Sequence, residues 1–271
     1  FNSTNNDNKN TPAEPTVKEL IKSIKKEKDA KAKFALYKQL RMKHKKAADR
    51  NEYLATTTDM YKWSLKYYKA NKKSAKNKID ALNMYYEATQ IYAKTFWTDD
   101  DGATAMKCID QAIGVIPTTT SRAELLYLKG RINEEAKNYD AAVKNYDLTL
   151  ADMAQFNLKT LSFSQDRVMW LKAWILYKNH QYEESTKALQ ALIDSTSDLS
   201  EKSRSQFYLA RALKALGKEK ESKDLLESVS QNDFFGYYGL VAYRELGKKL
   251  PALSKVKSAN ELKFDLKLEF L

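Results

Sequence analysis

The sequence predicts an all-α protein, a superhelix of degenerate helical repeats with about twelve helices. Three observations support this fold class: helix breakers are scarce, apolar residues recur at a helical period, and one spacing of small and large residues repeats. The 271 residues include seven Gly and four Pro, and no Pro lies between Pro117 and Pro251. Proline interrupts helices, so this long stretch lacks the strongest breaker. The apolar content of 43% is ample for a folded core.

The first elements follow from capping signals. Residues 1–14 are polar and rich in Asn without an apolar period, so we expect a disordered tether. Thr16 and Glu19 have capping-box spacing, which predicts a basic helix from that point. Asp29 is expected to cap a second helix, and a third is expected from Lys46 to Ala70.

The apolar period continues from Ser74 through Tyr92, and the next helix is expected after Asp101-Gly102. The acidic residues 99–101 also suggest a calcium loop. However, an EF-hand register anchored on Gly102 would put Trp97 first and Cys108 last, and neither is a plausible oxygen ligand. A helix N-terminus stabilised by carboxylates is the better interpretation.

A repeated spacing from residue 130 onward indicates tetratricopeptide-like units. In such a unit a small residue on the first helix meets a small residue twelve positions later, and a large residue follows after four more. The matching triplets are Gly130, Ala142 and Tyr146; Ala173, Ser185 and Leu189; and Ala210, Ser222 and Leu226. Further helix starts are predicted at Ser121 with Glu124 and at Asp198 with Glu201, and helix ends at Gly217 and Gly247.

The composition of the chain limits the classes of function that it can have. The net charge of +12 suggests an anionic partner, and residues 1–50 hold fourteen Lys or Arg against six Asp or Glu. Lys outnumbers Arg, whose bidentate fork suits phosphate and base recognition, so nucleic-acid binding is not favoured. One cysteine, Cys108, and two histidines, His44 and His180, provide no metal-site pattern, and the sequence predicts no cofactor.

The aromatic residues Trp170, Trp174 and Tyr177 are three and four positions apart, so they share one helix face. The repeat pattern favours core packing for them. A ligand-binding role would instead show as exposure on a groove.

The segment 234–247, followed by Leu250-Pro251, resembles the closing helix of the superhelical, U-shaped region in soluble lytic murein transglycosylases. The matching positions are Tyr238, Gly239, Ala242, Arg244, Leu246 and Gly247. Leu240-Val241 and Glu245 depart from that family's pattern, which leaves the register open. The structural alternative is a capping helix that could end any solenoid.

This resemblance implies a periplasmic bacterial protein whose superhelix carries a lysozyme-like catalytic domain. Such a domain cleaves peptidoglycan with a single Glu in a Glu-Ser motif. No residue here matches that motif, so no catalytic residue carries over, and the chemistry is expected from an absent domain. The alternative is a tetratricopeptide-type adaptor that binds a peptide or protein in its groove.

The predicted organisation is a tether over 1–14, a superhelical repeat domain over 15–250 and a C-terminal segment over 251–271 leading to a missing domain or partner. Within that segment apolar residues alternate from Leu262 to Phe270, which predicts a short strand, with an amphipathic helix as the alternative. No stretch is apolar and long enough to span a membrane. Since the chain begins at Phe1 without a leader, we expect a processed or excised chain.

Overall fold

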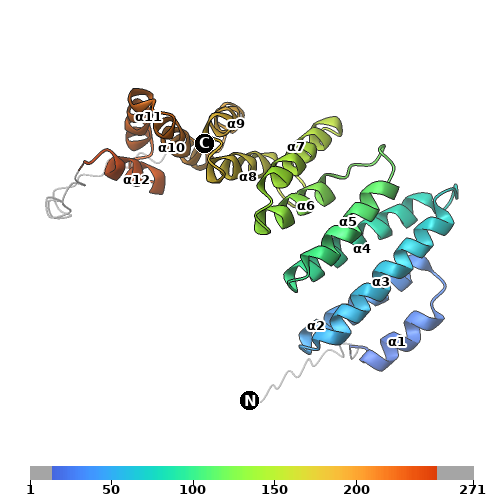
Figure 1. Cartoon of the computed structure of the whole chain (residues 1–271). Helices are drawn as coiled ribbons and strands as arrows, with labels where there is room; N and C mark the ends of the chain where they lie inside the picture. The colour runs from blue at the N-terminus through green and yellow to red at the C-terminus, as the bar shows by residue number, and fades with distance from the viewer. Residues whose placement is uncertain (1–13, 249–271) are drawn as a thin grey trace, which may run out of the picture. The chain divides into compact units, whose positions relative to one another are not determined.

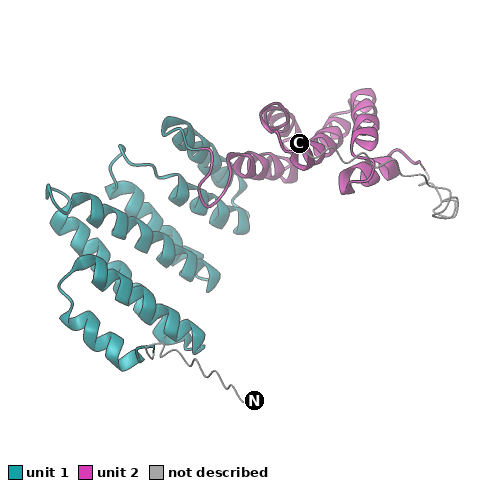
Figure 2. Cartoon of the chain, turned by 180° about the vertical axis from the view of Figure 1, so that it is seen from behind, with its two compact units in different colours: residues 1–158 teal, residues 159–271 magenta. Residues whose placement is uncertain are grey.

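The structure is a computed structural model that describes residues 14–248, which form twelve α-helices (Figure 1). Within these residues there is no strand, so the predicted all-α helical-repeat fold is confirmed. The expected tether up to residue 13 and the C-terminal strand lie outside the described residues. Chain contacts group the helices into two compact units, residues 1–158 and 159–271, which Figure 2 colours separately.

The helices of unit 1 are α1 (Val17–Lys26), α2 (Ala30–Lys46), α3 (Arg50–Asn71), α4 (Lys78–Thr98), α5 (Gly102–Val115), α6 (Ala123–Glu135) and α7 (Tyr139–Gln155). Those of unit 2 are α8 (Gln165–Lys178), α9 (Tyr182–Ser195), α10 (Leu199–Ala215), α11 (Glu219–Asn232) and α12 (Tyr237–Glu245).

Each unit has two layers of helices. Consecutive helices pack together, and α4 also contacts α2 and α6, while α10 also contacts α8 and α12. We therefore call α2, α4 and α6 the even layer of unit 1, and α8, α10 and α12 the even layer of unit 2. The remaining helices form the odd layers. This alternation is what stacked antiparallel helix pairs produce.

Four predicted helix starts are confirmed with their caps. Thr16 and Glu19 form the reciprocal capping box of α1. The carboxylates of Asp29, Asp101 and Asp198 each accept a backbone N–H in the first turn of α2, α5 and α10. These side chains satisfy amides that have no partner inside the helix. Asp101 thus has the helix-start role that the sequence favoured over calcium binding.

One predicted helix start, that of the third helix, was early. The third helix begins at Arg50 rather than Lys46, because α2 continues to Lys46 and Ala48 adopts a positive φ of 55° that ends it. Asp49 then caps α3 through the N–H of Glu52. The fourth helix begins at Lys78, since the Ser74 hydroxyl accepts the Asn77 N–H in a preceding turn.

The start predicted at Ser121 is corrected to Ala123, with Arg122 as N-cap. The Ser121 hydroxyl donates to Asp152 of α7 at 2.5 Å and accepts the Ala123 N–H. Asp152 itself accepts the N–H groups of Arg122 and Ala123, at 3.0 and 3.1 Å. A residue from the neighbouring helix therefore caps α6.

The repeat triplets form the contacts between paired helices. A Cβ on Gly130 would come within 2.6 Å of the Tyr146 ring, so only a glycine permits this approach. The Ser185 hydroxyl donates to the Ala173 carbonyl at 3.0 Å across the α8–α9 pair. All nine triplet residues are buried. The small-on-large contact is confirmed for Gly130 and Tyr146, and Ala210 and Leu226 share one core cluster. Gly217 and Gly247 have the positive φ values predicted for helix ends.

Candidate functional site

Unit 2 carries a row of aromatic side chains along its even layer. Trp170, Trp174 and Tyr177 follow one face of α8, and their neighbouring ring centroids are 6.0 and 5.7 Å apart. Tyr208 of α10 meets all three edge-on, at 5.3, 5.0 and 5.7 Å. Tyr238 of α12 lies 6.3 Å from Tyr208. The row therefore connects three helices, and we call these five residues the aromatic row.

The exposure of the row differs from the core role favoured by the sequence. Trp170 is buried at 7% exposure, but the other four rings are partly exposed. Burial raises the pKa of Tyr177 and of Tyr238, so both phenols stay neutral over the usual pH range. The aromatic row thus packs against unit 2 on one side, and part of its other side is exposed to solvent.

Two arginines of α10 flank the row. The Arg204 guanidinium lies 3.8 Å from the Trp170 ring centroid and pairs with Glu201. Arg211 contacts the Phe207 ring at 5.9 Å and Glu245 of α12 at 3.7 Å, with 43% of its side chain exposed. Arginine stacked on an aromatic ring keeps its charge while covering apolar surface. The surface therefore combines flat apolar rings with two arginine side chains, each held beside a glutamate.

Sequence reasoning found the α8 rings but missed Arg204, Tyr208 and Arg211. A signal was available from the repeat alignment. The residue after each first small position is Arg131, Trp174 and Arg211, and all three are large. Within unit 2, aligning the repeats at that position would have led from Trp174 to Arg211, but not to Arg204 or Tyr208.

The transglycosylase-like motif residues lie on and next to α12. Tyr238 belongs to the aromatic row, and Ala242 is fully buried in a core cluster with Phe207 and Leu226, on which Leu246 also packs.

A Cβ on Gly239 would come within 1.8 Å of the Asp233 carbonyl oxygen, so a close backbone approach requires this glycine. Gly247 ends the helix at a φ of +72°, while Arg244 is exposed. Helix packing accounts for most of the motif.

The residues examined for metal chemistry are not assembled into a centre. Among the described residues no group of three His, Cys, Asp or Glu side chains could hold a metal ion. Cys108 is buried, which raises the pKa of its thiol to about 12 and keeps it protonated. His44 is buried in α2, and His180 lies 2.7 Å from the Tyr182 hydroxyl.

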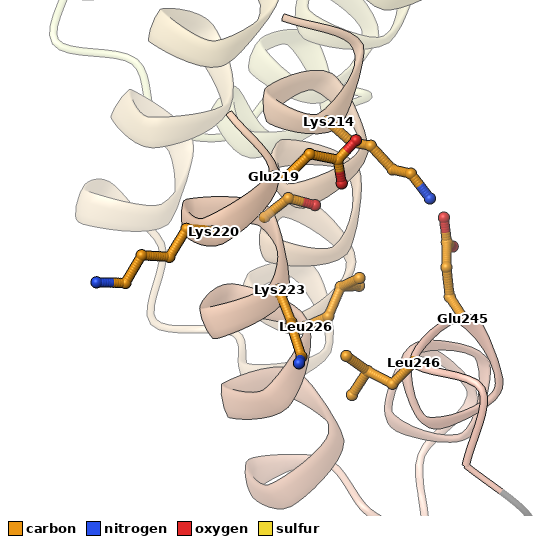
Figure 3. A pocket seen from close by; sticks show the side chains of 8 residues that line it. Lys214, Glu219, Lys220, Lys223, Leu226, Glu245 and Leu246 are labelled. Atoms are coloured by element: carbon orange, nitrogen blue, oxygen red, sulfur yellow. The ribbon is translucent and has the colours of Figure 1, made fainter. Parts of the chain in front are cut away.

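A cavity of about 440 Å³ opens at the ends of α10, α11 and α12 (Figure 3). Leu226 and Leu246 form its apolar floor, and the other residues are Lys214, Glu219, Lys220, Ser222, Lys223 and Glu245. In Figure 3 the Lys214 side chain extends toward Glu245, whereas Lys220 points away. Its charges of both signs favour no particular ligand, so the aromatic row is the stronger candidate.

Comparison with known proteins assigns the fold. The chain is similar to the nearly identical TPR-like repeats of a Podosopora anserina kinesin light chain, with 15% identity, TM-score 0.53, and coverage of 76% of this chain and 97% of that one. It is also similar to BtubC from P. vanneervenii, with 10% identity, TM-score 0.53, and coverage of 87% and 92%. The MamA protein matches at 13% identity, TM-score 0.51, and coverage of 80% and 97%.

These likenesses define a protein with a tetratricopeptide-like helical-repeat fold. No family model matches the chain, and no curated protein matches it. In residues 14–248, no helix combines the length and apolarity needed to cross a membrane.

Proposed function

We propose that this chain is a non-enzymatic adaptor that binds a protein or peptide segment on the even layer of unit 2. The observation that carries the proposal is the partly exposed aromatic row flanked by Arg204 and Arg211. Trp, Tyr and Arg are the residues most enriched at the energetic centres of protein interfaces. Stacked helix pairs provide the rigid surface on which such a row can act.

The geometry favours an extended segment as the ligand. The rings come from three successive helices of one layer, so a segment lying across α8, α10 and α12 would contact all of them. Packing already restricts the rings, so their ordering on binding costs little side-chain entropy. Arg204 and Arg211 would then add contacts to carbonyl or carboxylate oxygens of the ligand.

The test begins with selection of binding peptides from a random display library on the intact chain. Affinities of the selected peptides are then measured by fluorescence polarisation for the wild type and for the double variant Trp174→Ala, Tyr208→Ala. We expect the variant to lose at least about tenfold in affinity, because truncating an interface hot spot costs about 2 kcal/mol or more.

The matched control is Lys187→Ala, Gln190→Ala, two exposed positions on α9 in the odd layer. It should retain wild-type affinity, and circular dichroism should show the same helix content for all three proteins. Peptides that bind the wild type and the aromatic double variant equally well would refute the proposed surface.

A second candidate function rests on the α12 resemblance alone. In it the chain is the non-catalytic superhelical part of a periplasmic lytic transglycosylase that positions peptidoglycan for a separate catalytic domain. This function predicts that the isolated chain co-sediments with purified sacculi and releases no 1,6-anhydro products. Absence of co-sedimentation would refute this second function. Release of 1,6-anhydro products would show that the chain itself catalyses the cleavage.

A further inference from the structure

The positive charge of the chain is concentrated in the first three helices. Residues 14–78 contain 20 Lys or Arg and 7 Asp or Glu, whereas residues 79–248 contain 21 and 24. The N-terminal segment therefore carries a large cationic surplus, while the rest of the described chain is slightly acidic. A surplus placed on one part of a surface produces a local field that the net charge alone does not reveal.

This charge is arranged in two rows of lysines on the odd layer of unit 1. On α1 the exposed residues Lys18, Lys22, Lys25 and Lys26 lie opposite the buried Leu20 and Ile24. On α3 the exposed residues Lys62, Lys66 and Lys69 lie opposite the buried Met60, Ser64 and Tyr68. Spacings of three and four residues keep each row on one helix face.

Both rows point away from the same neighbouring layer. The buried sides of α1 and α3 both pack against α2 of the even layer. The opposite sides, which carry the lysines, therefore face outward from the odd layer. We call the two rows together the lysine face.

The lysine face is not neutralised within the described chain. Ion pairs to carboxylates engage other lysines, namely Lys31 with Asp80, Lys38 with Glu87 and Lys43 with Glu14. Among residues 14–248, no ion pair involves the seven lysines of the two rows. Unpaired like charges at this density repel one another, so an anionic partner would relieve a cost already present.

The chemistry of the cations favours a diffuse anionic surface over base readout. The two arginines of this segment have partners: Arg41 donates to Tyr53, Thr57 and Thr95, and Arg50 pairs with Asp99. The exposed cations of this segment that have no partner are therefore lysines, which act as point charges and lack the planar fork.

The positions of the aromatic and apolar residues favour a lipid surface over a nucleic acid as the partner. Trp63 and Tyr67 of α3 pack with Phe34 and Tyr37 of α2, so these rings are already used in the fold. Binding of single strands normally depends on free rings for base stacking. By contrast, Ile21 is 40% exposed within the α1 lysine row, a combination that suits the interface of a bilayer.

We propose that the lysine face docks the protein on an anionic lipid bilayer surface, separately from the ligand surface of unit 2. Each lysine brought near an anionic bilayer contributes a favourable term, and several together are needed for stable attachment. The attachment should weaken with salt, since exposed charges are screened beyond about 8 Å at physiological ionic strength. Ile21 would add a small apolar contact.

The experiment is co-sedimentation of the full chain with vesicles of phosphatidylcholine alone or mixed with phosphatidylglycerol. We expect binding to the mixed vesicles and not to the neutral ones, weakening as salt rises. The variant Lys18→Glu, Lys22→Glu, Lys25→Glu, Lys26→Glu should lose at least about tenfold in vesicle affinity.

The control for net charge is Lys187→Glu, Lys218→Glu, Lys220→Glu, Lys223→Glu, four exposed lysines of unit 2. It changes the total charge by the same amount and should retain most of the binding. A Lys→Gln version of the α1 variant keeps helix-forming side chains and should show an intermediate loss, with thermal melts confirming that each protein is folded.

Three outcomes would overturn the proposal: equal loss in the α1 and unit 2 charge variants, equal binding to neutral vesicles, or binding to RNA or DNA but not to anionic vesicles. The double variant Trp174→Ala, Tyr208→Ala should bind vesicles as the wild type does. That result would show that vesicle binding by the lysine face and ligand binding by the aromatic row can be tested, and refuted, independently.

Discussion

The two units use aromatic residues in opposite ways. In unit 1, Tyr61 and Tyr68 of α3 pack against Tyr85 of α4 inside the core, with ring centroids 6.0 and 5.3 Å from that of the fully buried Tyr85. In unit 2, Trp174 and Tyr208 have similar ring distances but remain partly exposed. The residue types and helical spacings are alike. The difference is whether a neighbouring helix covers the outer side of the rings, as α5 does in unit 1.

The largest predicted loss of stability tests directly whether the rings of the two units differ in burial. Tyr85→Ala should lower the free energy of unfolding by about 3–5 kcal/mol, because it leaves a cavity in a packed core. Trp174→Ala should cost roughly 1–2 kcal/mol, since part of its ring already contacts solvent. Urea unfolding followed by circular dichroism gives both values. Equal losses would mean that Trp174 is a core residue and would remove the central support for the adaptor surface.

A smaller effect is expected at the contact that buries Tyr146 in unit 1. Gly130→Ala places a methyl group against the Tyr146 ring and should destabilise the protein by about 1–3 kcal/mol. Gly114→Ala in α5 is the control, because no atom lies within 4 Å of its added Cβ. It should stabilise the protein by about 0.5–1 kcal/mol through reduced backbone entropy of the unfolded chain.

Thermal melts distinguish the two glycines by the sign of the shift. If Gly130→Ala melted at or above the wild-type temperature, the close approach of α6 and α7 would not be a requirement of the fold. The repeat spacing of unit 1 would then need another explanation than small-on-large packing.

The fold was predictable because most of its signals are local. Asp29, Asp101 and Asp198 cap helices that begin directly after them, so the sequence near each one is sufficient. The cap of α6 was not predictable in this way, since its carboxylate belongs to Asp152, about thirty residues away. Ser121 therefore suggested a start two residues before the observed one. Local rules located the helices, while tertiary contacts determined one of their ends.

The candidate site was predictable in part. The spacing of Trp170, Trp174 and Tyr177 shows that they share a face, but not whether another helix covers that face. Tyr208 and Arg204 complete the surface from α10, and their role depends on how α8 and α10 pack. Sequence periodicity describes one helix at a time, whereas this surface exists only between helices.

The smallest expected effect concerns two helix caps, one in each unit, that differ in charge. In unit 1 the Asp101 carboxylate caps α5, and hydrogen bonds from the Thr104 side chain and backbone N–H lower its pKa. In unit 2 the neutral Ser164 hydroxyl caps α8. A lowered folded-state pKa gives stability that is present above the unfolded pKa and is lost as the pH falls through the folded value.

The variant Asp101→Asn keeps a capping oxygen but removes this titration. It should be slightly less stable than the wild type at neutral pH. The difference should shrink as the pH falls below about 4, the ordinary carboxylate pKa, and should vanish once the pH is below the lowered pKa of the folded wild-type carboxylate. Melting temperatures across this pH range measure the convergence. Asp100→Asn is the matched control, because in the described part of the chain the Asp100 carboxylate accepts no hydrogen bond, and its curve should follow the wild type. A pH-independent deficit in Asp101→Asn would show that the cap acts by shape and not by charge, which would make the Asp101 and Ser164 caps equivalent.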